Sequence, residues 1–211
     1  MDRIYDWRDL GLQGMDIVLC AGNSKMSRRI QTFQRLTTIG EECGEEWKLT
    51  HVAGVYQRVE GDWDHVQEST TINKWAGKKG VQMNPMASWL PNYDGEVYVR
   101  KLDFHRGTGF IDRDFNFWME HKGDDYENGI PGVLELFLCG LRLHRFVRKI
   151  FPSYTPKFTK EPHCTELQAK RMLEHDLWDG LMAINRMPPW MWASAIDNCL
   201  KVPISKPIRI K

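Results

Sequence analysis

The stretch PHCTEL at residues 162–167 stands directly ahead of a long helical pattern, and LTHVAGVY at residues 49–56 has the apolar, β-branched content of a strand. A thiol at a helix N-terminus meets partly positive backbone N–H groups, which favour the thiolate. Cys164 occupies that position. His51, on the strand, is the best candidate for a base that would complete a nucleophile and base pair. The histidine therefore precedes the cysteine in the chain.

Further strand patterns surround the histidine strand and predict an antiparallel sheet of about four to six strands. The expected elements are a buried strand at residues 15–20, a hairpin over 49–71 with a turn signal at 60–62, and strands at 81–83 and 96–102. The first half of the chain is thus expected to be mostly β.

Glu68 on the return arm of the hairpin is a candidate partner for His51. The two residues have opposite parity in number, so any pairing with an odd index sum places them on the same face of the sheet. A tight turn at Gly61 and Asp62 would leave them about four residues apart along the sheet, which is too far for contact. A bulge or a longer connection must therefore shorten the gap if they are partners.

Helical patterns follow the first strand and dominate the second half. Ser24 or Ser27 can cap a helix after the first strand. Further helical segments are expected at residues 86–90, at the aromatic stretch 110–118, at 134–147 after Pro131, and from Cys164 to Pro188. The pattern predicts an α+β fold of one domain over residues 1–211, with an arm at 1–13, a core at about 14–187 and an extension at 188–211.

Composition narrows the classes of partner. The 211 residues carry 29 Lys and Arg against 28 Asp and Glu, so no strong basic field favours nucleic acid. The acidic loop at residues 41–46 is expected to be a solvated connection. The nine tryptophans, with Trp75, Trp89, Trp118 and Trp178 in apolar stretches, are expected mainly in the core, and packing is also favoured for Trp190 and Trp192 over a role covering a cleft.

The five cysteines are widely spaced and include no C-x-x-C pair, which favours a reducing compartment over a disulfide framework or a zinc site. The sequence predicts neither a metal nor a cofactor. The N-terminal residues lack the apolar core of a signal peptide, and charges interrupt the longest apolar stretch, residues 133–151. We expect a cytoplasmic protein with no integral membrane segment.

Several stretches together resemble the circularly permuted papain-fold cysteine hydrolases of the YiiX and YaeF type, distant kin of the NlpC cell-wall peptidases. The stretches that carry the resemblance are MDIVL at 15–19, THVAGV at 50–55, QESTT at 67–71, GVQ at 80–82, YVR at 98–100 and CTEL at 164–167. The resemblance spans most of residues 14–187 and implies a permuted papain-like fold. It also implies that His51 acts as base, that Glu68 orients it, and that Cys164 is the nucleophile.

The chain departs from the family pattern at positions expected to rim the cleft. Leu49 and Thr50 replace the usual small residue before the histidine, His163 replaces the commoner aromatic residue before the cysteine, and the acidic loop is longer than usual. GDDY at residues 123–126 fits a Gly-x-x-Tyr element of the family, although no role is assigned to Tyr126. These departures leave the three catalytic groups in place and leave the substrate open.

Each candidate also has a plain structural interpretation. A lone cysteine before an amphipathic helix is more often a small buried hydrophobe, His51 alone is more often a satisfied strand residue, and Glu68 alone a surface carboxylate. His65 is a rival base, but its surroundings suggest the turn end of the hairpin. His163 is expected at the cleft rim or in solvent, and Cys20 in the core.

Two classes of function follow. The first is a cysteine amidase or peptidase that works through a thioester, with peptidoglycan peptides as the leading substrate and lipid acyl bonds, in a hydrolase or acyltransferase reaction, as the second. The other class is a non-catalytic structural or interaction module, for example a phage particle component with virion partners. A wall enzyme without a signal peptide would need delivery to the cell envelope by a phage or another route, or would be virion-associated.

Overall fold

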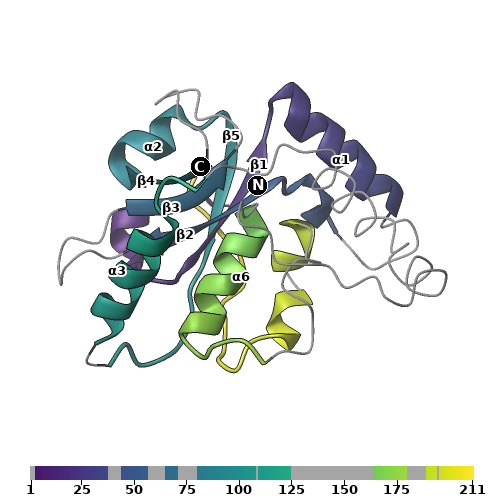
Figure 1. Cartoon of the computed structure of the whole chain (residues 1–211). Helices are drawn as coiled ribbons and strands as arrows, with labels where there is room; N and C mark the ends of the chain where they lie inside the picture. Colours follow the sequence, from purple (N-terminus) through teal and green to yellow (C-terminus); the bar gives the residue numbers. More distant parts are fainter. Residues whose placement is uncertain are drawn as a thin grey trace, which may run out of the picture.

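A six-stranded sheet forms the centre of the computed structural model, which describes residues 3–37, 44–56, 65–70, 80–107, 109–124, 164–179, 189–193 and 195–211. The strand order is β4-β3-β2-β1-β5-β6, and every neighbouring pair is antiparallel. The predicted α+β class is confirmed, and six strands lie at the upper end of the expected range (Figure 1).

The elements follow the expected order along the described chain. The strands are β1 (Ile17–Gly22), β2 (His51–Tyr56), β3 (His65–Thr70), β4 (Gly80–Pro85), β5 (Gly95–Arg100) and β6 (Ile208–Arg209). The α-helices are α1 (Lys25–Thr37), α2 (Met86–Asn92), α3 (Phe110–His121) and α6 (Cys164–Glu174). Short 3₁₀ turns are η1 (Trp7–Leu10), η2 (Glu46–Lys48), η4 (Pro189–Trp192) and η5 (Ala195–Asn198).

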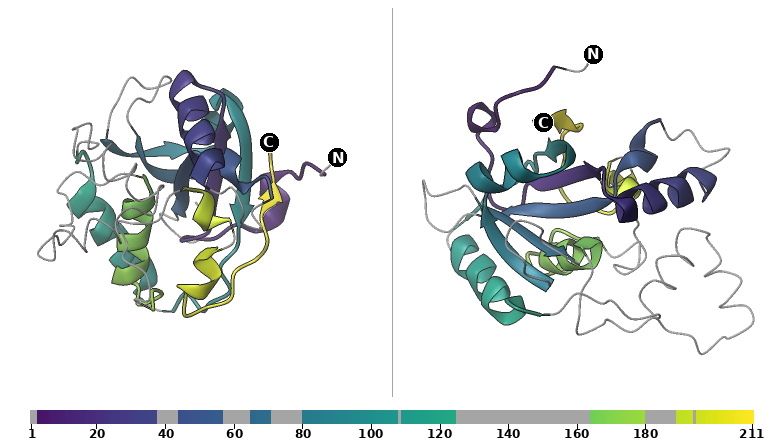
Figure 2. Two further views of the ribbon diagram at one scale, coloured as in Figure 1. Left: turned by 90° about the vertical axis from the view of Figure 1, so that its right-hand side faces the viewer. Right: turned by 90° about the horizontal axis from the view of Figure 1, so that it is seen from above.

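The apolar run of β1 is continuous because both faces of this central strand are covered. Val18 and Cys20 belong to the core cluster that includes residues of α2, whereas Ile17 and Leu19 belong to the cluster that includes residues of α6. Figure 2 shows α2 on one side of the sheet and α6 on the other. We call these the α2 face and the α6 face.

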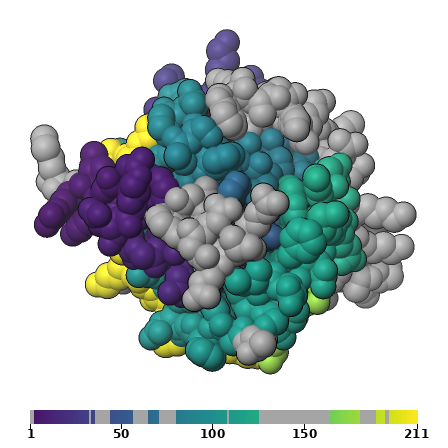
Figure 3. Space-filling view, turned by 90° about the vertical axis from the view of Figure 1, so that its left-hand side faces the viewer, coloured from purple at the N-terminus to yellow at the C-terminus, as the bar shows by residue number. Residues whose placement is uncertain are grey.

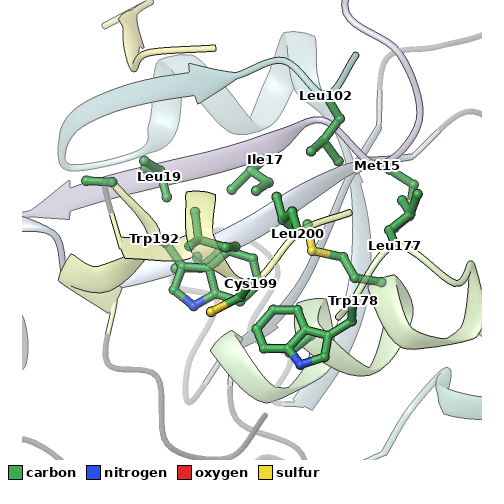
Figure 4. Close-up of a cluster of buried hydrophobic side chains, with 14 of the residues drawn as sticks. Met15, Ile17, Leu19, Leu102, Leu177, Trp178, Trp192, Cys199 and Leu200 are labelled. Carbon is green, nitrogen blue, oxygen red and sulfur yellow. The ribbon is translucent and has the colours of Figure 1, made fainter. Parts of the chain in front are cut away.

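The C-terminal residues complete the core of the α6 face. Trp178 and Trp192 lie with ring centroids 6.4 Å apart, beside Cys199 (Figure 4). Packing, as expected, accounts for the burial of Trp192. Farther along, β6 pairs with β5, and the backbone N–H of Tyr5 donates to the carbonyl of Arg209, so that the described N-terminal arm lies beside the C-terminal strand (Figure 3).

Ser24 is the N-cap of α1, since its hydroxyl oxygen accepts a hydrogen bond from the backbone N–H of Ser27 at 3.1 Å. Of the two expected capping residues, the first therefore does the capping. Two glutamines on this helix hold the chain that leads into β2: Gln31 donates to the carbonyl of Lys48 and Gln34 to that of Leu49.

The helix that begins at Cys164 is shorter than predicted. It ends at Glu174, because Asp176 adopts a left-handed conformation with φ of 57°. The N–H of Leu177 donates to the carbonyl of Met172, and that of Asp176 to Leu173, which is the Schellman pattern of a helix end. Trp178 then forms a β-bridge with Leu200, so the prediction of a helix running on to Pro188 is wrong.

Several predicted features lie outside the described residues. They are the turn at 60–62, the helix at 134–147, the side chains of Trp75, Tyr126 and His163, and the cysteines Cys43 and Cys139. Within the part of the chain that the structure describes, no helix is long and apolar enough to cross a membrane.

Candidate active site

The register of β2 and β3 brings His51 and Glu68 together. Gly54 pairs with Gln67 and Val55 with Val66, an odd index sum, so the two candidates share a face as expected. In this register Thr70 is opposite His51 and Glu68 is its diagonal neighbour. His51 Nε2 and Glu68 Oε2 are 2.8 Å apart. This register places the two residues closer along the sheet than a tight turn at Gly61 and Asp62 would, and the connection that sets it lies outside the described residues.

Glu68 is almost completely enclosed, with its side chain 5% exposed. Its second oxygen, Oε1, accepts hydrogen bonds from the Asn84 amide and from the Trp89 indole N–H, each at 3.1 Å. Asn84 is on β4, two residues after Gln82, which is the partner of Glu68, so it points to the same face. Trp89 is on α2. Sequence reasoning expected Trp89 only in the core and did not single out Asn84, because strand register alone shows that Asn84 shares this face.

Gly54 allows α6 to lie close against β2. A Cβ at this position would be 2.4 Å from Gln168 Oε1 and 2.5 Å from Arg171 Nη1. Both side chains bind the sheet backbone: Gln168 donates to the carbonyl of Gln67 at 3.0 Å, and Arg171 to that of Val55 at 2.9 Å. Since α6 is fixed over the middle of β2 in this way, its first turn, with Cys164, reaches the beginning of the strand.

A buried ion pair ties α6 to α3. Arg171 donates through Nε and Nη2 to the two carboxylate oxygens of Asp114 at 2.6 Å, and both side chains are fully buried. Burial alone would raise the pKa of Asp114, but the charge of Arg171 and the contact with His175 hold it below its usual value. This pair gives the helix that carries Cys164 a fixed orientation.

Cys164 is the first residue of α6, as predicted, and its side chain hydrogen-bonds to His51. Burial would lower the pKa of His51, yet the charge of Cys164, the hydrogen bond to it, and Glu68 raise that pKa to about 10. Because Nε2 faces Glu68, Nδ1 is the ring nitrogen left for Cys164. The arrangement favours an imidazolium beside a thiolate.

The His51 side chain is 15% exposed and the Cys164 residue 6% exposed. The pair therefore sits just below the surface formed by the described residues. Such enclosure strengthens the interaction between the two charges, because little water screens them.

A second thiol lies beside the pair and differs from it chemically. Cys20 is the partner of His51 across β1 and β2 and is fully buried, in accord with the expectation of a core residue. Burial raises the pKa of Cys20 well above 9.0, and the nearby charges of Glu68 and Cys164 raise it further. The Tyr93 hydroxyl hydrogen-bonds to this thiol. Cys20 therefore stays protonated, whereas Cys164 has the cationic His51 as its partner.

His65, the rival base, is the first residue of β3 and pairs with Tyr56 and Pro85. It therefore lies at the turn end of the hairpin, as predicted. Its Nδ1 is buried and has no hydrogen-bond partner among the described residues. Among the described histidines, His51 is the one that contacts both Glu68 and Cys164.

A surface cavity of about 810 Å³ lies at the far end of β1, lined by residues that include Asp16, Lys101 and Arg106. Arg106 donates to Asp16 and to backbone carbonyls, and Lys101 donates to the carbonyl of Leu10. The charged groups of Lys101 and Arg106 in this cavity are thus taken up by structural contacts. Cys164, His51 and Glu68 do not line it. Among the residues described, no group of three or more His, Cys, Asp or Glu side chains could hold a metal ion.

Comparison of the sequence with models of known protein families and with curated proteins finds no match. The functional interpretation therefore rests on the geometry of Cys164, His51 and Glu68.

Proposed function

We propose that this protein is a cysteine hydrolase, an amidase or peptidase, with Cys164 as nucleophile, His51 as general acid and base, and Glu68 as the residue that orients His51. One observation carries the proposal: side chains from α6, β2 and β3 form a continuous Cys164–His51–Glu68 chain of hydrogen bonds. The order of histidine strand and cysteine helix adds support through the resemblance to permuted papain-fold hydrolases.

The reaction follows from these groups. The Cys164 thiolate attacks an acyl carbon, and backbone N–H groups at the start of α6 stabilise the resulting oxyanion. Protonated His51 gives its proton to the leaving amine as the carbon–nitrogen bond breaks, which leaves a thioester. Neutral His51 then takes a proton from water as the water attacks the thioester, and the carboxylic acid and the thiolate are released.

Peptidoglycan peptides are the leading substrate, because the family that the chain resembles has cell-wall peptidases among its kin. The test is incubation of the protein with purified peptidoglycan and, separately, with phospholipid vesicles, followed by mass analysis of the products. New peptide termini that are absent with Cys164→Ala support the proposal. Release of fatty acid instead would assign the site to lipid acyl chemistry.

Thiol reactivity gives an independent test. Iodoacetamide at neutral pH is expected to label Cys164 ahead of the other four cysteines, because its thiolate is paired with His51 whereas Cys20 is held protonated. Uniform labelling, together with no product from either substrate, would favour a non-catalytic structural module.

A further inference from the structure

The carboxylate of Glu68 divides its two oxygens between different kinds of partner. Oε1 accepts from the Asn84 amide and the Trp89 indole, each at 3.1 Å, while Oε2 contacts His51 at 2.8 Å. The indole N–H and the amide NH₂ are donors only, so neither can exchange roles with the carboxylate. Oε2 is thereby reserved for the imidazole.

The two donors are held rigidly. Trp89 is 5% exposed and belongs to the apolar cluster of the α2 face, and its ring lies 5.1 Å from that of Tyr93. Asn84 is 5% exposed and is fixed by the ladder between β3 and β4. A carboxylate with a single histidine partner can rotate and exchange its oxygens. The hydrogen bonds from Asn84 on β4 and Trp89 on α2 hold the Glu68 carboxylate in one orientation.

We propose that Asn84 and Trp89 are positioning residues of this site, which fix the Glu68 carboxylate so that it holds the His51 imidazole with Nδ1 directed at Cys164. The inference rests on the proposed function for its catalytic consequence. Its structural consequence, a fixed imidazole, can be measured without any substrate.

The pKa of His51 reports on this support. Among the described residues, the ionisable groups near it are Glu68 on β3, Cys164 on α6, Cys20 on β1 and, through its contact with Cys20, Tyr93 after α2. Loss of one donor to Glu68 leaves Cys164, Cys20 and Tyr93 in place. Only the Glu68 carboxylate becomes less firmly oriented. The imidazolium then loses part of its stabilisation, so its titration midpoint should fall.

The experiment uses Trp89→Phe, which keeps an aromatic ring and deletes the N–H, and Asn84→Leu, which deletes the amide at similar volume. Trp192→Phe is the matched control, because the buried Trp192 indole N–H has no hydrogen-bond partner among the described residues and lies on the α6 face. Long-range ¹H–¹⁵N NMR of the full chain measures the His51 titration midpoint and the protonation of each ring nitrogen.

Each of the two test variants is expected to lower the midpoint by about one pH unit, the equivalent of one hydrogen bond to a charged group. Where hydrolysis is observed, kcat should fall roughly tenfold with KM little changed, because an interaction that orients the base is lost rather than substrate binding. The Trp192→Phe control should leave both quantities at the level of the unsubstituted protein.

An unchanged midpoint and unchanged ring-nitrogen shifts in both test variants would overturn the inference, even in an active enzyme. A lowered midpoint in a protein that cleaves no acyl substrate would support the positioning contacts and count against the proposed function. In the unsubstituted protein, the Trp89 indole proton should resist solvent exchange and shift as His51 titrates. An indole resonance insensitive to that titration would also refute the inference.

Discussion

The two faces of the sheet hold the candidate site by different means. On the α6 face, polar and charged side chains attach the helix: Gln168 and Arg171 bind carbonyls of the sheet, and Arg171 binds Asp114. On the α2 face, apolar side chains pack α2 against the sheet, and the indole N–H of Trp89 on this helix donates to Glu68. The nucleophile is thus positioned by directional bonds that cross from helix to sheet, and the base by a carboxylate held at the edge of an apolar cluster.

Cys164 is the proposed nucleophile, so Cys164→Ala should have the largest effect on activity. Activity should fall at least about a thousandfold, since removal of the nucleophile ends covalent catalysis. The free energy of unfolding should fall by only about 1.5–3 kcal/mol, because the His51 imidazolium loses its hydrogen-bonded partner while the fold keeps its other contacts. Cys199→Ala, a buried cysteine on the α6 face, is the control and should retain full activity. Residual turnover in Cys164→Ala would point to another nucleophile.

The α6 face is best tested by breaking its ion pair. Asp114→Ala should lower the free energy of unfolding by about 3–5 kcal/mol, because it leaves the fully buried Arg171 without its partner. Urea denaturation measures this change. Asp112→Ala, at an exposed position of the same helix, should be nearly neutral. Equal stability of the two variants would mean that the ion pair does not anchor α6.

A smaller change tests the close approach of α6 to β2. Gly54→Ala should cost about 1–3 kcal/mol, because its methyl group would overlap the positions of Gln168 and Arg171. It should also reduce activity by displacing Cys164 from His51. Gly107→Ala is the control, since its Cβ would be 3.6 Å from the nearest atom outside its immediate chain neighbours, an ordinary contact. Unfolding curves and initial rates for the two variants decide the point.

The last test is a pH dependence of stability that comes from His51. The pKa of His51 is raised from 6.5 to about 10, so the folded chain holds a proton that the unfolded chain releases in this interval. The stability this provides is complete below about pH 6.5 and is lost as the pH rises toward about 10. The difference in unfolding free energy between the unsubstituted protein and His51→Gln should shrink over that range. A difference that stays constant would show that the imidazole is not stabilised in its charged form.

Local patterns in the sequence were sufficient for strands β1 to β5 and for the position of Cys164 at a helix start. The parity of His51 and Glu68 predicted a shared face, but the register depended on the length of the connection between β2 and β3, which composition does not determine. Asp176 ended α6 in a conformation more typical of glycine, so no glycine marked the stop.

Other features depended on tertiary structure alone. Asn84 joined the site through its strand neighbour, and no local pattern distinguishes it from any other polar strand residue. The two-residue β6 is too short for periodicity to indicate, and it lies in the segment that was expected to be only an extension.

The Arg100 side chain contacts the C-terminal segment at three points, donating to the carbonyls of Trp192 and Ser205 and to the carboxylate of Asp197. Because one buried guanidinium links all three, this segment should open as a cooperative unit and not fray residue by residue. Such an opening would take β6 from the sheet and leave β5 as a bare edge, able to pair with a strand of another molecule. We therefore expect loss of the Arg100 contacts to increase pairing between molecules at this edge.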